Sequence, residues 1–131
     1  MKVSHFCGIT DCNTVEELES VLSIRCGDGV NEFWISGDKD IPCLAVLVNN
    51  DYANLTYFPE DGHPGYQSIG MDTDLRPEGT TIFYTNTQDE EIEVYNDTVV
   101  PFAKALEAVK EYFITSTIPS CIKWRELSSR G

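Results

Sequence analysis

His63 is the residue in this chain whose type and surroundings are best suited to chemistry. It lies in the segment Gly62-His63-Pro64-Gly65, directly after Asp61. An imidazole within hydrogen-bond reach of Cys7, Cys12 or the Asp61 carboxylate would form the nucleophile-and-base pair of a small hydrolase or transferase. The sequence does not show such a contact, and a solvent-facing histidine in a turn is the simpler interpretation.

The other signals for chemistry are weaker. The chain contains no G-x-S-x-G, phosphate-binding loop, dinucleotide-binding glycine pattern or H-E-x-x-H. Asp89-Glu90-Glu91 and Asp72-x-Asp74 offer carboxylates for calcium, but they lack the ordered ligand spacing and central glycine of an EF-hand loop. We therefore expect solvated surface charge, no metal, no cofactor and no enzymatic activity.

The five cysteines also argue against a metal site. Cys7, Cys12, Cys26, Cys43 and Cys121 are an odd number and include no C-x-x-C pair. This pattern disfavours a disulfide framework or a zinc knuckle. Free, buried thiols in a reducing compartment are the expectation.

The balance of charge restricts the class of partner. Nine basic residues stand against 22 acidic ones, for a net charge of −13 and a sequence pI near 4.3. Binding to nucleic acid or to an anionic membrane needs basic patches, so both partners are disfavoured. A basic protein partner is favoured, and simple solubility is the alternative use of the charge.

Targeting signals are absent from the sequence. The N-terminal residues MKVSHFCG lack the apolar region of a signal peptide, and no apolar run approaches the roughly 18 residues of a membrane-spanning helix. These features predict a cytoplasmic protein.

The element that organises the chain is a predicted hairpin over Pro42–Pro59. Cys43–Val48 is an unbroken apolar run, and residues 53–58 return with mostly alternating polarity. A two-residue turn at Asn50-Asp51 fixes the register and gathers the apolar pairs on one face, with Asn54 and Thr56 on the other. The pairs are Val48 with Ala53, Val46 with Leu55, and Leu44 with Tyr57.

Two helices flank this hairpin in the sequence. The first begins with the capping box Thr14-Val15-Glu16-Glu17 and ends by Cys26. The second begins at Pro101 and ends before Thr115. Its apolar stripe has helical spacing and comprises Phe102, Ala105, Leu106, Val109 and Phe113.

The remaining segments are predicted as strands, loops or irregular ends. Strands are expected at 31–36, 80–84, 91–95 and 121–124, with 80–84 and 91–95 joined as a hairpin. Residues 60–66 are expected to form a loop, and residues 67–79 an irregular acidic segment. Residues 1–13 are expected to be irregular or an edge strand, and 128–131 a frayed tail.

These elements predict one α+β domain spanning residues 1–131. Its sheet is antiparallel, with about five to six strands and both helices packed on one face. Phe113 and Trp124 are expected to be buried together between helix and sheet. The predicted core consists of Leu44, Val46, Leu55, Tyr57, Phe102, Leu106, Phe113 and Trp124.

Residues 42–126 carry a resemblance to a known family. The ordered features are a turn followed by Ala53–Pro59, Gly62 with Gly65, Val100-Pro101, a helix ending in Glu111-Tyr112-Phe113, then Thr115, Pro119 and Cys121–Trp124. This series resembles the first-numbered immunity-protein family of bacterial polymorphic toxin systems. Phe113 and Trp124 match the phenylalanine and tryptophan that mark the family, whereas Ser116 stands where it would have a glycine.

The resemblance implies a function for a chain that carries no catalytic pattern. Members of the family are encoded beside secreted toxins, often ones that end in a nucleic-acid deaminase domain, and they protect the producing cell by binding the toxin. The leading hypothesis is thus an inhibitor that occludes the basic cleft of such a toxin. The His63-based enzyme and an acidic adaptor for another protein are the alternatives.

The sequence also suggests where such a partner binds. Between Cys26 and Ala103 only Lys39 and Arg76 are basic, and most of the acidic residues there fall in predicted loops. Aromatic residues with charged rims are typical of binding hot spots. The candidate partner-binding residues are Glu60, Asp61, His63, Tyr66, Asp72 and Asp74.

Overall fold

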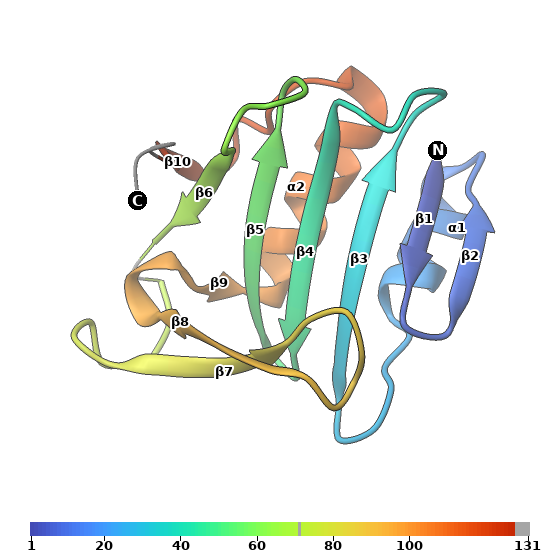
Figure 1. Ribbon diagram of the computed structural model, residues 1–131. Coiled ribbons are helices and arrows are strands. Elements are labelled where there is room, and N and C mark those ends of the chain that lie inside the picture. Colours follow the sequence, from blue (N-terminus) through green and yellow to red (C-terminus); the bar gives the residue numbers. More distant parts are fainter. Residues whose placement is uncertain (71, 128–131) are drawn as a thin grey trace.

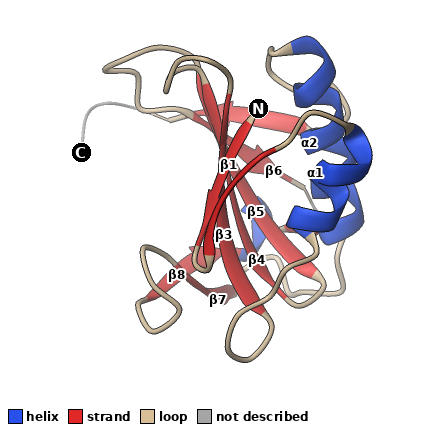
Figure 2. Cartoon of the chain, turned by 90° about the vertical axis from the view of Figure 1, so that its right-hand side faces the viewer, coloured by secondary structure: helices blue, strands red, loops and turns tan. Residues whose placement is uncertain are grey.

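An antiparallel sheet with two α-helices on one face makes up the body of the protein (Figure 1, Figure 2). The structure is a computed structural model that describes residues 1–70 and 72–127. In chain order the elements are β1 (Lys2–His5), β2 (Gly8–Asp11), α1 (Val15–Leu22), β3 (Val30–Ser36), β4 (Cys43–Asn49), β5 (Tyr52–Phe58), β6 (Tyr66–Ile69), β7 (Thr80–Tyr84), β8 (Glu91–Tyr95), the 3-10 helix η1 (Asn96–Thr98), β9 (Val100–Pro101), α2 (Phe102–Thr115) and β10 (Lys123–Glu126).

The main sheet has eight strands in the order β10-β6-β5-β4-β3-β1-β2, with β9 paired to β5. β7 and β8 form a second, two-stranded sheet. The predicted α+β class with both helices on one face is confirmed. The main sheet has more strands than the expected five to six, although the predicted strands 80–84 and 91–95 lie outside it in the second sheet. The additional strands are β1, β2 and β6, from segments expected to be irregular or, for residues 1–13, a single edge strand, and β9, which ends at Pro101, the expected start of the second helix.

β4 and β5 form the predicted central hairpin with the predicted register. Leu44 pairs with Tyr57, Val46 with Leu55, and Val48 with Ala53. Asn50 at the turn has a φ of 54°, a left-handed conformation that asparagine tolerates better than most residues. On the face of this hairpin that packs against the helices, Leu44, Val46, Leu55 and Tyr57 are all buried.

The capping box of α1 forms as the sequence predicts. Thr14 accepts a hydrogen bond at Oγ1 from the backbone N–H of Glu17 at 3.1 Å, and the Glu17 carboxylate accepts from the N–H of Asn13 at 3.2 Å. The helix ends at Leu22, and Arg25 donates to the Leu22 carbonyl oxygen at 2.7 Å. α1 lies against α2, where Glu19 forms an ion pair with Lys110.

The buried face of α2 overlaps the predicted apolar stripe at Ala105 and Val109 but is rotated away from the rest of it. Its buried residues are Ala105, Ala108, Val109 and Tyr112, whereas Phe102, Leu106 and Phe113 are only partly buried against the core. Tyr112 takes the central place because its ring packs edge-on against Tyr57 at 6.0 Å and its hydroxyl donates to the carbonyl oxygen of Pro42 at 3.0 Å. A hydroxyl with a partner allows a tyrosine to be buried where an apolar stripe would not include it.

The expectation that Phe113 and Trp124 are buried together is wrong. Both are only partly buried. Phe113 shares a surface hollow with Met1 and Ile9 near β1 and β2, whereas Trp124 is in β10 at the opposite edge of the sheet. Trp124 is held by a hydrogen bond from its Nε1 to the carbonyl oxygen of Pro119 at 2.7 Å.

Part of the segment expected to be irregular at 67–79 is instead the strand β6. It pairs with β10 over four residue pairs and with β5 over two. Beyond those two pairs, the buried Ser68 hydroxyl accepts from the Leu55 N–H at 3.0 Å and donates to the Thr98 carbonyl oxygen at 2.8 Å. Asn54, buried on the non-helical face, donates to Oγ1 of Thr98 at 2.8 Å. A polar core of this kind has no hydrophobic periodicity for sequence reasoning to detect.

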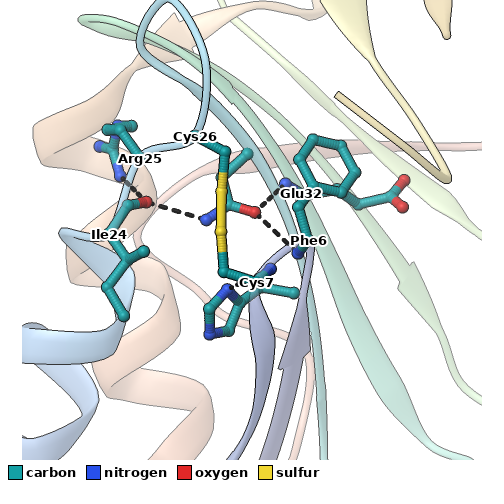
Figure 3. Close-up of a disulfide and its surroundings, with 8 residues drawn as sticks. Phe6, Cys7, Ile24, Arg25, Cys26 and Glu32 are labelled. Carbon is teal, nitrogen blue, oxygen red and sulfur yellow. Dashed lines mark hydrogen bonds between the residues drawn. A yellow bond between two sulfur atoms is a disulfide. The ribbon is translucent and has the colours of Figure 1, made fainter. Parts of the chain in front are cut away.

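The N-terminal segment forms the edge hairpin β1–β2, and a disulfide fastens it to the rest of the fold (Figure 3). Cys7 at its turn is bonded to Cys26, which corrects the expectation of free thiols for these two residues. Cys12, Cys43 and Cys121 are free, and Cys12 and Cys43 are buried. Spacing alone does not identify this pair, because only the folded chain places the turn beside the segment that leads into β3. The tail expected at 128–131 lies outside the described residues.

Candidate partner-binding surface

His63 contacts a carboxylate and a tyrosine, with no thiol among its hydrogen-bond partners in the described part of the chain. Its Nδ1 accepts a hydrogen bond from the Gly65 N–H at 2.8 Å, so the ring proton lies on Nε2 and faces Oε2 of Glu126 at 2.9 Å. The ring stacks on Tyr66 with centroids 5.0 Å apart, and the His63 side chain is only 14% exposed. Glu126 also contributes most to raising the pKa of Tyr66. His63 therefore ties the β5–β6 loop to β10.

The cysteines proposed as its partners are unsuited to nucleophilic attack. Cys7 is in the disulfide with Cys26. Burial raises the pKa of the Cys12 thiol. A reactive cysteine needs a lowered pKa, because the thiolate is the nucleophile.

The carboxylates considered for calcium remain separate. In residues 1–70 and 72–127, no three His, Cys, Asp or Glu side chains are grouped so as to hold a metal ion. Asp72 and Asp74 are both exposed.

Neither helix of the described residues combines the length and the apolar character that a membrane span requires.

The six candidate partner-binding residues fall into two groups at opposite ends of β6. Glu60 and Asp61 are exposed in the β5–β6 loop, close in sequence to His63 and Tyr66. Asp72 and Asp74 follow β6, and Asp74 accepts a hydrogen bond from the Tyr52 hydroxyl at 2.5 Å, which raises the pKa of Tyr52. Asp74 thus lies beside Tyr52 at the start of β5, whereas Tyr66 pairs with Tyr57 near the end of that strand. At about 3.3 Å per residue along β5, the two groups are about 17 Å apart.

The predicted hairpin of β7 and β8 is confirmed, and its position is a feature of the tertiary structure. It crosses the lower ends of β3, β4 and β5 on the face opposite the helices (Figure 1, Figure 2). Phe83 of β7 is fully buried. Asn49 of β4 donates a hydrogen bond to the carbonyl oxygen of Ile82 in β7 at 2.9 Å.

Glu32 holds the loop of this hairpin. Its carboxylate accepts hydrogen bonds from the Thr85 hydroxyl at 2.6 Å and from the Asn86 N–H at 3.0 Å. Glu32 is itself buried. Sequence reasoning missed this role, although a glutamate directly before Phe33 and Trp34 in a predicted strand is the kind of residue that needs a partner when buried.

The hairpin brings acidic side chains to one end of the sheet, which we call the acidic end. The 27–29 segment meets the β4–β5 turn through a hydrogen bond from the Asn50 N–H to the Gly29 carbonyl oxygen at 2.8 Å. Gln88 of the hairpin loop approaches Gly27, and Asp74 reaches the start of β5 through Tyr52. The acidic end comprises Asp28, Asp51, Asp74, Asp89, Glu90, Glu91 and Glu93. Within the described residues, none of these carboxylates is in a salt bridge.

Exposed apolar side chains accompany these carboxylates. Tyr95 on β8 is 70% exposed and Ile92 is 39% exposed. On the same face of the main sheet, Trp34 is 40% exposed and stacks on Phe58 with centroids 5.9 Å apart. Trp34 follows Glu32 by two residues, so its side chain lies about 7 Å along β3 from the carboxylate that holds the hairpin. None of these residues was among the predicted contacts.

An α+β fold that exposes carboxylates together with Trp34 and Tyr95 offers the kinds of side chain that protein-binding surfaces use. The family model described as "Immunity protein Imm1" matches residues 10–126. The chain therefore belongs to the Imm1 family, and it is an immunity protein, a non-enzymatic inhibitor. The resemblance drawn from residues 42–126 is confirmed and extends further towards the N-terminus.

One relative covers nearly the whole chain. This is the "Double-stranded DNA deaminase immunity protein" of Burkholderia cenocepacia (strain H111), with 29% identity over 128 residues. The match spans 97% of this chain and 100% of the relative.

Proposed function

We propose that this protein neutralises a toxin that deaminates double-stranded DNA, by covering the surface with which the toxin binds its substrate. The observation that carries the proposal is the full-length similarity to a double-stranded DNA deaminase immunity protein. Membership of the Imm1 family supports inhibition as the mode of action.

The charge of the protein suits this role. A toxin that binds DNA must present cations to the phosphates. A protein with a net charge of −13 is attracted to such a surface and competes with DNA for it. The partner is thus a protein with a basic cleft, not a nucleic acid or a membrane, and the inhibitor acts in the cytoplasm of the cell that makes the toxin.

The contacts proposed from the sequence form two patches on such an interface. Glu60 and Asp61 supply charge at one end of β6, beside the stacked rings of His63 and Tyr66, and Asp72 and Asp74 supply charge at the other end. These six residues do not form one compact cluster. A toxin that used both patches would have to span the length of β5.

The proposal is tested with the cognate toxin domain, assayed for base deamination in double-stranded DNA. Titration with this protein should abolish deamination at about one equivalent, and co-expression should protect cells. Because an inhibitor acts by occupancy, a substoichiometric amount should leave a proportional residual activity at all incubation times.

Other outcomes would refute the proposal. Progressive inactivation by a substoichiometric amount would indicate an enzyme that modifies the toxin. A lack of binding, together with a lack of protection, would favour the acidic adaptor with a different protein partner.

A further inference from the structure

We propose that the toxin's cationic DNA-binding surface docks on the sheet face opposite the helices, with the β7–β8 hairpin as the main contact element. This inference rests on the proposed function, since it takes the charge of the partner from it. The contact surface, here called the hairpin face, comprises Trp34 of the main sheet and Glu91, Ile92, Glu93 and Tyr95 of β8.

Unpaired charge is the first argument for the hairpin face. The acidic end includes the hairpin carboxylates and, within the described residues, contains no salt-bridged carboxylate. Arg76 lies close to the start of β7, but it is already paired with Glu78 at 2.9 Å. A cationic partner therefore meets carboxylates here without first displacing an internal cation.

The helix side of the molecule is less suited to the same partner. Four of the basic residues, Lys104, Lys110, Lys123 and Arg125, lie on α2 and β10. Lys104 and Lys110 pair with Glu107 and Glu19, so these acidic groups are already neutralised. A cationic surface would be repelled there or would have to replace existing ion pairs.

Exposed aromatic residues are the second, independent argument. Hot spots of protein interfaces are enriched in tryptophan and tyrosine. Trp34 and Tyr95 are the two exposed large aromatic residues of the described chain. Trp34 alternates along β3 with the core residues Phe33 and Ile35, so it lies on the non-helical face. Tyr95 lies on the β7–β8 hairpin, which crosses that face (Figure 1, Figure 2). The exposed Ile9 and Ile114 lie on β2 and α2, away from the hairpin.

The glutamates of β8 lie on a free strand edge, and charge at such an edge can have a role other than binding. β8 pairs with β7 on one side, and charged residues on an exposed strand edge also protect against unwanted pairing with other chains. Replacement of a glutamate by lysine separates the two roles. A lysine keeps the edge charged and protected, but it repels a cationic partner.

The test measures binding of the catalytically inactivated toxin domain to full-length variants of this protein. Glu93→Lys is compared with Glu16→Lys on α1, and Tyr95→Ala is compared with Ile114→Ala, which removes a side chain that is 75% exposed on α2. Asp61→Lys tests whether the toxin instead binds at the β5–β6 loop, at the end of β6 that is farther from the acidic end. Thermal unfolding of each variant verifies that the fold is kept.

We expect Tyr95→Ala to weaken binding about 30-fold, the factor that corresponds to a hot-spot side chain. Glu93→Lys should slow association about tenfold, with the effect fading as salt is raised. Glu16→Lys and Ile114→Ala should bind within about twofold of the wild type.

The inference is overturned if both hairpin variants bind like their controls while the wild type binds the toxin. A larger effect of Asp61→Lys than of Glu93→Lys would likewise overturn it, by placing the interface at the other end of β6. Failure of the wild-type protein to bind or inhibit the toxin would instead refute the proposed function itself.

Discussion

The fold shifts the pKa of Tyr112 by a large amount. Its side chain is 1% exposed, and burial raises its pKa to about 12 from the ordinary value of 10. Because the folded pKa exceeds the unfolded one, the unfolded chain loses this proton first as the pH rises. The contribution of Tyr112 to stability is therefore intact below pH 10 and is lost progressively between pH 10 and about 12.

Tyr112→Phe should remove this dependence. Below pH 10 the variant should lose about 1 kcal/mol of unfolding free energy, because the hydrogen bond to the Pro42 carbonyl oxygen is lost. Between pH 10 and about 12 the stability of the variant should fall less steeply than that of the wild type, by up to about 1.4 kcal/mol per pH unit. Urea unfolding at a series of pH values measures both effects. Equal slopes in the two proteins would contradict the assignment, and the exposed Tyr95→Phe is the control.

At the scale of elements, the β7–β8 hairpin depends on contacts with the face of the main sheet. Phe83 supplies the buried apolar contact, and Glu32 and Asn49 supply hydrogen bonds from β3 and β4. A hairpin of two strands is marginally stable by itself. Loss of any of these contacts should therefore make the hairpin more mobile.

Glu32→Ala should loosen the hairpin selectively. Two hydrogen bonds to a carboxylate are lost, and each such bond contributes about 1.5–3 kcal/mol. Hydrogen exchange should therefore accelerate in residues 80–95 more than in β4 and β5. The matched control is Glu91→Ala, which removes an exposed carboxylate of the same hairpin. Uniform acceleration over the whole sheet would show that Glu32 stabilises the global fold and not the hairpin alone.

At the scale of the whole molecule, the net charge of −13 should govern how fast the toxin is captured. Reversal of Asp61, Asp72 and Asp74 to lysine changes the charge by two units at each site, from −13 to −7. This variant should associate with the toxin severalfold more slowly, with little change in dissociation. The difference should shrink above 0.15 M salt, where the Debye length falls below about 8 Å.

A second triple variant separates the effect of where the charge lies from the effect of the net charge. Reversal of Glu16, Asp38 and Glu107 to lysine gives the same net charge of −7 with the candidate sites intact. Stopped-flow association rates of the two variants should differ if Asp61, Asp72 and Asp74 lie at the interface. Equal rates would show that only the overall field matters, and rates independent of salt would show that the charge serves solubility.

Features encoded by local periodicity were determined by the sequence itself. The register of β4 and β5 follows from alternating apolar residues around Asn50-Asp51, since a slip by one residue would expose the apolar face. The beginning of α1 follows from Thr14 and Glu17, which are three residues apart. The acidic character and the resemblance to the Imm1 family were also readable, because neither depends on how distant segments meet.

Features that depend on distant partners were decided only by the tertiary structure. Glu32 and Thr85 are 53 positions apart, and nothing near either residue indicates the hydrogen bond that positions the hairpin. β6 is held by β10 and by the Ser68 hydroxyl, so it lacks the apolar alternation of a predictable strand. The acidic end likewise unites loops from four parts of the chain. The sequence therefore predicted the acidic character of the chain, but only the packing of β7 and β8 on the sheet decided where the acidic end lies.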